Sequence, residues 1–185
     1  KIDQYIDLAT TFNKTHNLFV RKDKEEIYNK DILDCLPIIK LIKPNKTVAD
    51  LGSGGGLPGI LLSITKPKNK ITLIESNQKK CYFLRSVVHA LDLKNTTVLN
   101  KKLTKQNKLG VFDIITARAF ASIEKIIRLT TNNISEKSKY ILLKGREEKT
   151  QEELKLLDTK KYRYEIIKLD NKNQERSLVL IKNNE

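Results

Sequence analysis

The groups that could do chemistry are concentrated in one short segment of the chain. Five of the seven glycines lie between Gly52 and Gly59, directly after the apolar run 47–51. Glycines that follow a first strand let the backbone turn tightly and approach a ligand closely, and in an open parallel sheet this position is the usual ligand crevice. A tight turn alone would need one or two glycines, so the segment predicts a binding loop.

Three kinds of ligand are compatible with a glycine loop of this type. A nucleoside triphosphate loop ends in Gly-Lys-Ser or Gly-Lys-Thr, which is not found here. The dinucleotide pattern G-x-G-x-x-G fits Gly52 and Gly54, but Leu57 stands at its third glycine. The segment does match D-x-G-x-G-x-G, beginning at Asp50. A carboxylate before the glycines suits a cationic ligand, and this pattern is typical of enzymes that use S-adenosylmethionine.

Glu75 is a second candidate ligand residue, because it ends the expected second strand, 70–75. A carboxylate at this position can accept both ribose hydroxyls of an adenosyl group. NAD proteins use the same arrangement, so Glu75 does not distinguish the two cofactors. It could also be an acidic residue at the start of the following helix, where acids are favoured.

The net charge of +14 suggests a polyanionic partner. The first 34 residues are close to neutral, so the excess lies in residues 35–185. Basic clusters occur at 66–70, 79–80, 101–102 and 137–139, near expected strand ends, where they could contact phosphate. Lys far outnumbers Arg, which also agrees with lysine as a general solubilising residue. Charge alone favours nucleic acid.

Hydrophobic periodicity predicts the elements that position these residues. Strands are expected at 47–51, 70–75, 96–99, 112–117 and 139–144, and a terminal pair at 164–168 and 177–181. Helices are expected at 3–13, 24–42, 57–65, 77–91, 121–131 and 147–157, with His16 in the first loop. This alternation predicts an α/β fold with a mostly parallel, doubly wound sheet and an antiparallel edge. We expect one domain over 1–185, with a helical cap (1–44) and a Rossmann-like core (45–185).

The remaining reactive side chains form no recognisable constellation. Cys35 and Cys81 make no CxxC pair and have no His at metal spacing, so no metal site is expected. Both cysteines fit small core residues of a reduced, cytoplasmic protein. His16 and His89 have no partner at motif spacing and are expected to be packing or surface residues. No apolar run approaches 18 residues, so we expect no membrane-spanning helix.

Taken together, the motifs resemble a known family, the bacterial small-subunit ribosomal RNA (guanine-N7) methyltransferases called RsmG or GidB. The matching segments are Asn17-Leu18, Ile32-Leu33-Asp34, 50–60, Phe83-Leu84-Arg85, Phe112-Asp113, Ala117-Arg118-Ala119, Leu143-Lys144-Gly145 and Glu175-Arg176. The run Gly-Leu-Pro-Gly at 56–59, followed at these distances by Arg118 and Lys144, is specific to that family. The resemblance covers nearly the whole chain.

The resemblance implies a Rossmann-like methyltransferase fold, S-adenosyl-L-methionine as cofactor, and 16S rRNA or the small ribosomal subunit as partner. We expect the protein to be cytoplasmic and monomeric. It implies a cofactor site formed by Gly52, Gly54, Leu57, Glu75, Leu103, Thr104 and Arg118. It also implies that Arg118, Lys144 and Arg176 face the RNA substrate. Arg118 and Lys144 could instead form ordinary surface salt bridges.

The implied reaction needs no catalytic base. Guanine N7 carries a lone pair in the ring plane, so methylation is a direct displacement on a sulfonium methyl group and no proton leaves first. We therefore assign no catalytic residue, and expect Arg118 and Lys144 to act by positioning.

The chain departs from the family pattern at several positions. Asp31 replaces a usual His, Cys35 a Ser, Glu75 an Asp, Ser177 a frequent His, and Lys102-Leu103-Thr104 stands in place of Arg-x-Glu. Loss of that last acid weakly favours an RNA-binding module without activity. The glycine loop would also suit a small-molecule or protein methyltransferase or an NAD enzyme. The positive charge and the family-specific segments oppose a small-molecule or protein methyltransferase. Leu57, in place of the third glycine, opposes an NAD enzyme.

Overall fold

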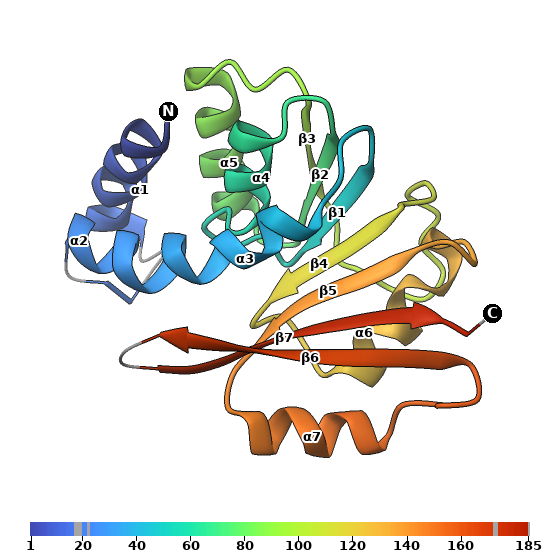
Figure 1. Ribbon diagram of the computed structural model, residues 1–185. Helices are drawn as coiled ribbons and strands as arrows, with labels where there is room; N and C mark the ends of the chain where they lie inside the picture. The colour runs from blue at the N-terminus through green and yellow to red at the C-terminus, as the bar shows by residue number, and fades with distance from the viewer. Residues whose placement is uncertain (17–19, 22, 172–173, 185) are drawn as a thin grey trace.

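The computed structural model describes residues 1–16, 20–21, 23–171 and 174–184 (Figure 1). The helices are α1 (Ile2–His16), α2 (Lys24–Ile27), the π-helical turn η1 (Tyr28–Ile32), α3 (Leu33–Leu41), α4 (Gly59–Thr65), α5 (Gln78–Ala90), α6 (Ile123–Thr130), the 3-10 turn η2 (Thr131–Asn133) and α7 (Glu147–Lys155). The strands are β1 (Thr47–Leu51), β2 (Lys70–Glu75), β3 (Thr96–Asn100), β4 (Ile114–Arg118), β5 (Lys139–Lys144), β6 (Tyr162–Asn171) and β7 (Gln174–Asn183).

The strands form one sheet in the order β3-β2-β1-β4-β5-β7-β6. The pairs among β1 to β5 are parallel, whereas β7 runs antiparallel to both β5 and β6. This confirms the predicted doubly wound sheet with an antiparallel edge hairpin. Because β1 and β4 are neighbours in the middle of the sheet, the chain reverses its direction of winding there, and such a reversal opens a crevice at the carboxyl ends of the strands.

Both faces of the sheet are covered by helices (Figure 1). On one face, Val48 of β1 and Ile141 of β5 belong to a buried cluster that also contains residues of α1, α3, α4 and α5. On the other face, the neighbouring residues Ala49 and Leu142 pack with residues of α6 and α7. The alternation follows from the two-residue period of a strand. Because the helices before β1 share a buried cluster with the core, we propose that residues 1–185 fold as one domain.

Several predicted boundaries need correction. The helix expected at 57–65 begins at Gly59, because the glycine turn continues through Pro58. His16 ends α1 and does not lie in a loop, and the region predicted as one helix from 24 to 42 contains a π-helical turn. The terminal strands, expected at 164–168 and 177–181, are 10 residues each.

A hydrogen bond joins the N-terminal cap to the glycine loop. Tyr5 of α1 is fully buried, and its hydroxyl donates to the carbonyl oxygen of Gly55 at 2.7 Å. Burial raises the pKa of Tyr5 well above its usual value, so the hydroxyl keeps its proton and remains a donor. The cap therefore holds one side of the loop in place.

We expect Tyr5→Phe to lower the free energy of unfolding by about 1 kcal/mol, because it removes this hydrogen bond while keeping the aromatic ring. Urea unfolding measures the change. Tyr28→Phe is the matched control, since Tyr28 is 45% exposed and its substitution should have little effect. Equal stability of the Tyr5 and Tyr28 variants would contradict the role of the Tyr5 hydroxyl.

Candidate active site

A cleft of about 750 Å³ lies at the carboxyl ends of β1, β4 and β5. It is lined by most of the residues predicted for the site, namely Gly52, Gly54, Leu57, Arg118, Lys144 and Arg176. A second cleft of about 380 Å³ is lined by Glu75 and Leu103. Gly52 and Phe120 line both clefts, so the two are adjacent.

Glycine is required in the loop for backbone reasons. Gly52 and Gly54 have φ angles of +62° and +54°, in the left-handed region that other residues adopt only with strain. The amide of Gly52 donates to the carbonyl oxygen of Ile74 in β2 at 2.8 Å. At Gly59, a Cβ atom would lie 2.6 Å from a carboxylate oxygen of Asp50 and would overlap Leu73. Gly59 therefore lets α4 begin in direct contact with β1 and β2.

Asp50 lies beneath the loop and is fully buried. One carboxylate oxygen accepts a hydrogen bond from the amide of Gly59 at 3.2 Å, and the other is buried without a hydrogen-bond partner among the described residues. Burial raises the pKa of Asp50 to about 7. An orphaned carboxylate oxygen at this position fits a cationic ligand, although Asp50 does not itself line either cleft.

Glu75 fixes the loop and the start of α5. One carboxylate oxygen accepts from the amide of Gly54 at 2.9 Å, and the other accepts from the amide of Asn77 at 2.8 Å. Glu75 therefore does bind the start of the following helix, the alternative that the sequence left open. Since Glu75 also lines the smaller cleft, a ribose contact is compatible with the same geometry.

The two residues predicted on the adenine side differ in position. Leu103 lines the smaller cleft next to Lys101 and Lys102. The amide of Thr104 instead donates to the side-chain oxygen of Asn107 at 2.7 Å, and Thr104 lines neither of the two clefts described. The structure thus brings Leu103, but not Thr104, to the site.

Sequence reasoning missed Phe120. Its ring lies directly against Gly52, so that a Cβ atom at Gly52 would overlap it. The ring follows Ala119, which has a positive φ angle of 52°, at the end of β4. An aromatic residue two positions after Arg118 at the carboxyl edge was the signal that could have identified it.

The guanidinium of Arg118 is fixed by Asp31. The two side chains form an ion pair at 2.6 Å, and Asp31 also binds Arg21 at 2.7 Å. Asp31 is 1% exposed, so a single buried carboxylate binds both Arg21 and Arg118. Burial opposes the charge of Arg118, but the adjacent Asp31 carboxylate raises its pKa above the ordinary value. Arg118 therefore stays charged at any physiological pH.

The other two predicted cations are also paired. The ammonium of Lys144 lies 2.6 Å from a carboxylate oxygen of Glu153 in α7 and donates to the carbonyl oxygen of Ala121 at 2.9 Å. Arg176 of β7 lies 3.1 Å from Asp34. The salt bridges that the sequence left open for Arg118 and Lys144 exist, but they form at the cleft. Their acidic partners were not identified from the sequence.

Neither cleft is lined by Cys35, Cys81, His16 or His89. Cys35 and Cys81 are buried, and burial raises the pKa of Cys35 to about 12, which keeps it a neutral thiol. His16 packs on the ring of Phe12 with 4.3 Å between ring centroids. Within the described ranges there is no group of three or more His, Cys, Asp or Glu that could hold a metal, and no helix long and apolar enough to cross a bilayer.

Known proteins are similar to this chain over most of its length. The family model for rRNA small subunit methyltransferase G matches residues 1–179. A Brachyspira hyodysenteriae protein named ribosomal RNA small subunit methyltransferase G is 38% identical over 183 residues, covering 98% of this chain and 89% of the relative.

Solved structures share the fold at low sequence identity. Precorrin-6y C5,15-methyltransferase from Geobacter metallireducens superposes with a TM-score of 0.65 at 14% identity, covering 90% of this chain and 91% of that chain. TrmK from M. capricolum, solved with S-adenosyl-homocysteine, gives a TM-score of 0.63 at 18% identity, with coverages of 80% and 67%. These two likenesses establish a methyltransferase-type fold.

We expect Asp50→Asn to gain stability relative to the wild type as pH rises. The folded pKa of about 7 lies above the unfolded value near 3.9, so the folded wild type binds the extra proton and loses stability as pH rises through 7. Asn does not titrate, so the stability difference should shift by about 2–3 kcal/mol between pH 5 and 8. Urea unfolding across this range measures it. Asp92→Asn, on the surface, should show no such trend, and a flat difference for Asp50→Asn would contradict the raised pKa.

Proposed function

Because the chain belongs to the rRNA small subunit methyltransferase G family, we propose that it transfers a methyl group from S-adenosyl-L-methionine to N7 of a guanine in 16S ribosomal RNA. The observation that carries the proposal is the family match over residues 1–179, with the glycine loop of that family at the carboxyl edge of the sheet. We also propose that the protein is cytoplasmic and acts on RNA as a monomer.

The residues present fit the proposed cofactor. Gly52, Gly54 and Leu57 line the larger cleft, and Glu75 and Leu103 line the smaller one. We assign the cationic methionine end to the larger cleft, near the loop that covers Asp50, and the adenosine end to the smaller cleft, where Glu75 could accept from ribose hydroxyls. When bound, S-adenosylmethionine supplies an electrophilic methyl group on a sulfonium. Thr104 remains a proposal from the sequence alone.

The side chains at the cleft would position the RNA rather than move protons. Guanine N7 attacks through a lone pair, so no group has to remove a proton. Arg118, Lys144 and Arg176 are each held by a carboxylate, which fixes their orientation before RNA arrives. Cations fixed in this way can bind phosphate or orient the target base. Alignment of nucleophile and methyl group can lower a barrier by up to about 7–11 kcal/mol.

Calorimetric titration tests the cofactor assignment. We expect S-adenosylhomocysteine to bind the wild type and NAD not to bind. Gly52→Val should abolish S-adenosylhomocysteine binding, because it combines a strained φ of +62° with overlap on Phe120. Gly110→Val is the matched control, since Gly110 also has a positive φ but has open space around its Cβ position. Binding of NAD alone would overturn the proposal.

The pH dependence of the rate tests the target atom. At saturating cofactor and RNA, the single-turnover rate should be nearly flat from about pH 6 to 8.5, because no group titrates in the transition state. Saturation matters because Asp50, with a pKa of about 7, can affect cofactor affinity in this range. Arg118→Ala and Lys144→Ala should lower the rate or the RNA affinity about tenfold or more without adding a pH dependence.

The variant His89→Ala tests whether His89 acts as a general base, and it should keep the wild-type rate. A rate that rises tenfold per pH unit below neutrality, and that is lost with His16 or His89, would show that the target atom carries a proton. The assignment to N7 would then be wrong, even if the family assignment held.

A further inference from the structure

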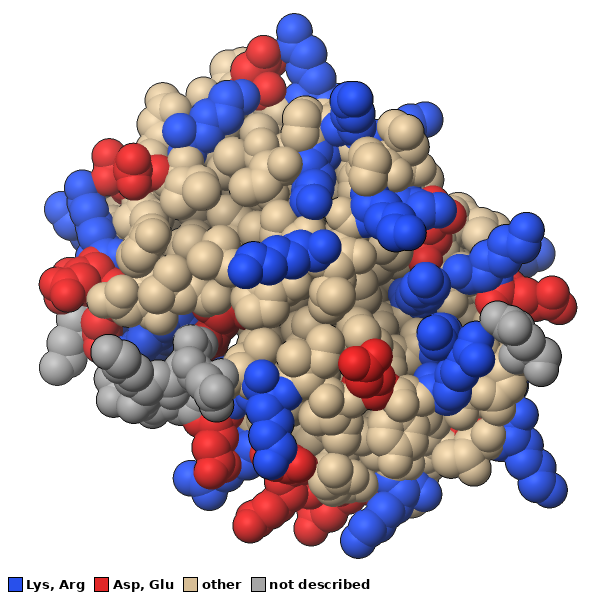
Figure 2. Space-filling view, viewed as in Figure 1, with Lys and Arg blue, Asp and Glu red and all other residues tan. Residues whose placement is uncertain are grey.

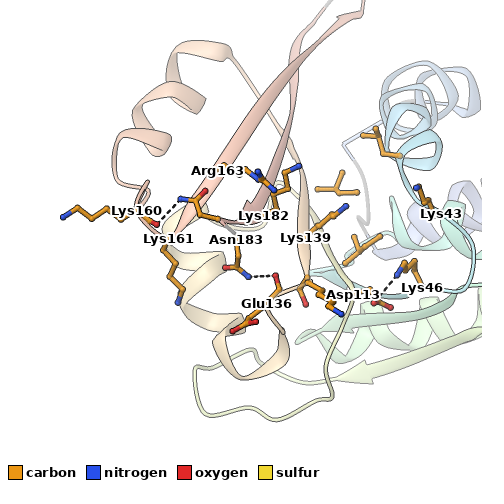
Figure 3. A pocket seen from close by; sticks show the side chains of 16 residues that line it. Lys43, Lys46, Asp113, Glu136, Lys139, Lys160, Lys161, Arg163, Lys182 and Asn183 are labelled. Carbon is orange, nitrogen blue, oxygen red and sulfur yellow. Dashed lines mark hydrogen bonds and ion pairs between the residues drawn. The ribbon is translucent and has the colours of Figure 1, made fainter.

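A second, larger hollow lies at the opposite edge of the sheet from the active-site clefts. Its volume is about 1090 Å³, and it is formed where β1, β4, β5 and β6 begin and β7 ends. Eight of its 16 lining residues are Lys or Arg, and two are Asp or Glu (Figure 3). We call it the basic groove; its cations include Lys43, Lys46, Lys139, Lys160, Arg163 and Lys182.

Three of these cations stand side by side across three strands. Lys139 of β5 is directly opposite Lys182 of β7, and Lys182 is directly opposite Arg163 of β6. Residues in register point to the same face of a sheet, and like charges placed directly opposite each other are destabilising. An anion bound next to the ammonium groups of Lys139 and Lys182 would reduce the repulsion between these two lysines.

The carboxylates in the groove offset only part of this charge, since two acids face eight cations. Asp113 already accepts hydrogen bonds from the amide of Thr47 at 2.8 Å and from the ammonium of Lys46 at 3.5 Å. Those bonds lower the pKa of Asp113, so it is fully ionised yet already engaged. Figure 2 shows Lys and Arg outnumbering Asp and Glu on the side of the molecule where β7 ends. The basic groove therefore presents a net positive field.

We propose that the basic groove binds the phosphate backbone of the RNA substrate at a point away from the methylated guanine. This inference rests on the proposed function, because ribosomal RNA is what supplies the phosphates. Seven of the eight groove cations are Lys, which binds phosphate as a point charge and carries no base-specific geometry. The groove would anchor the RNA without reading its sequence.

The distance between groove and cleft requires a long RNA. β5 runs from Lys139 in the groove to Lys144 in the active-site cleft, which is roughly 17 Å at about 3.3 Å per residue. A single nucleotide cannot contact both ends of the strand. RNA held by both sites must therefore pass around the antiparallel edge of the sheet or over a helical face, and a short oligonucleotide at the cleft would not use the groove.

A matched pair of triple variants tests the proposal. The groove variant is Lys139→Gln, Lys160→Gln and Lys182→Gln; the control is Lys14→Gln, Lys108→Gln and Lys155→Gln, which removes the same charge from exposed sites outside the groove. We would measure the Kd for naked 16S rRNA at several salt concentrations. S-adenosylhomocysteine affinity and the single-turnover rate at saturating RNA report on the integrity of the fold and of the active site.

The groove variant should bind 16S rRNA about tenfold or more weakly at physiological salt. The slope of log K against log salt should become shallower by about 2–3, since each lost phosphate contact removes about 0.7–0.9. The control should stay within about twofold of the wild type. The affinity for S-adenosylhomocysteine and the single-turnover rate at saturating RNA should be unchanged in both variants.

Two results would overturn the inference while leaving the proposed function intact. If groove and control variants lose affinity equally, the groove charge serves only solubility. If the groove variant loses affinity for assembled small subunits but not for naked 16S rRNA, the groove contacts a ribosomal protein and not RNA. The proposed function fails separately, if the wild type methylates neither naked 16S rRNA nor assembled small subunits.

Discussion

The contact of α4 with β1 and β2 at Gly59 is the constraint on which the active site depends. Only glycine leaves room there for the Asp50 carboxylate and the Leu73 side chain, and the Gly59 amide donates a hydrogen bond to that carboxylate. The loop that joins β1 to α4 must therefore turn within a few residues, which requires the positive φ angles at Gly52 and Gly54. Glu75 completes the arrangement by binding the Gly54 amide. The loop is thus shaped by the protein itself before any ligand binds.

The cations of the cleft depend in turn on the helical cap. Asp31 and Asp34, which hold Arg118 and Arg176, both come from the cap, whereas the arginines come from β4 and β7. Both acids are nearly fully buried. Removing one partner of a buried pair leaves an uncompensated charge, which generally destabilises strongly. The cap therefore contributes both to the stability of the core and to the orientation of the arginines that line the larger cleft.

Local pattern was enough to predict the succession of strands along the chain and the antiparallel edge, and β5 was predicted with its observed ends at 139 and 144. The order of the strands in the sheet was not predicted. The hairpin strands were predicted too short because much of β6 is exposed and carries no continuous apolar pattern. The glycine loop was found from composition, but the partner of Arg118 was not, because Asp31 is 87 residues away and meets it only through the packing of the cap. The row formed by Lys139, Lys182 and Arg163 likewise required the strand register.

The π-helical turn at Tyr28–Ile32 has a consequence for how this protein can vary in evolution. A π-helical turn is equivalent to one residue inserted into an α-helix. Each residue of a helix advances it by about 100°, so losing one residue here would rotate α2 relative to α3 within the turn that carries Asp31, the partner of Arg118. Substitutions in this stretch change single contacts, whereas a deletion changes all of them at once. Length should therefore be more strictly preserved here than residue identity.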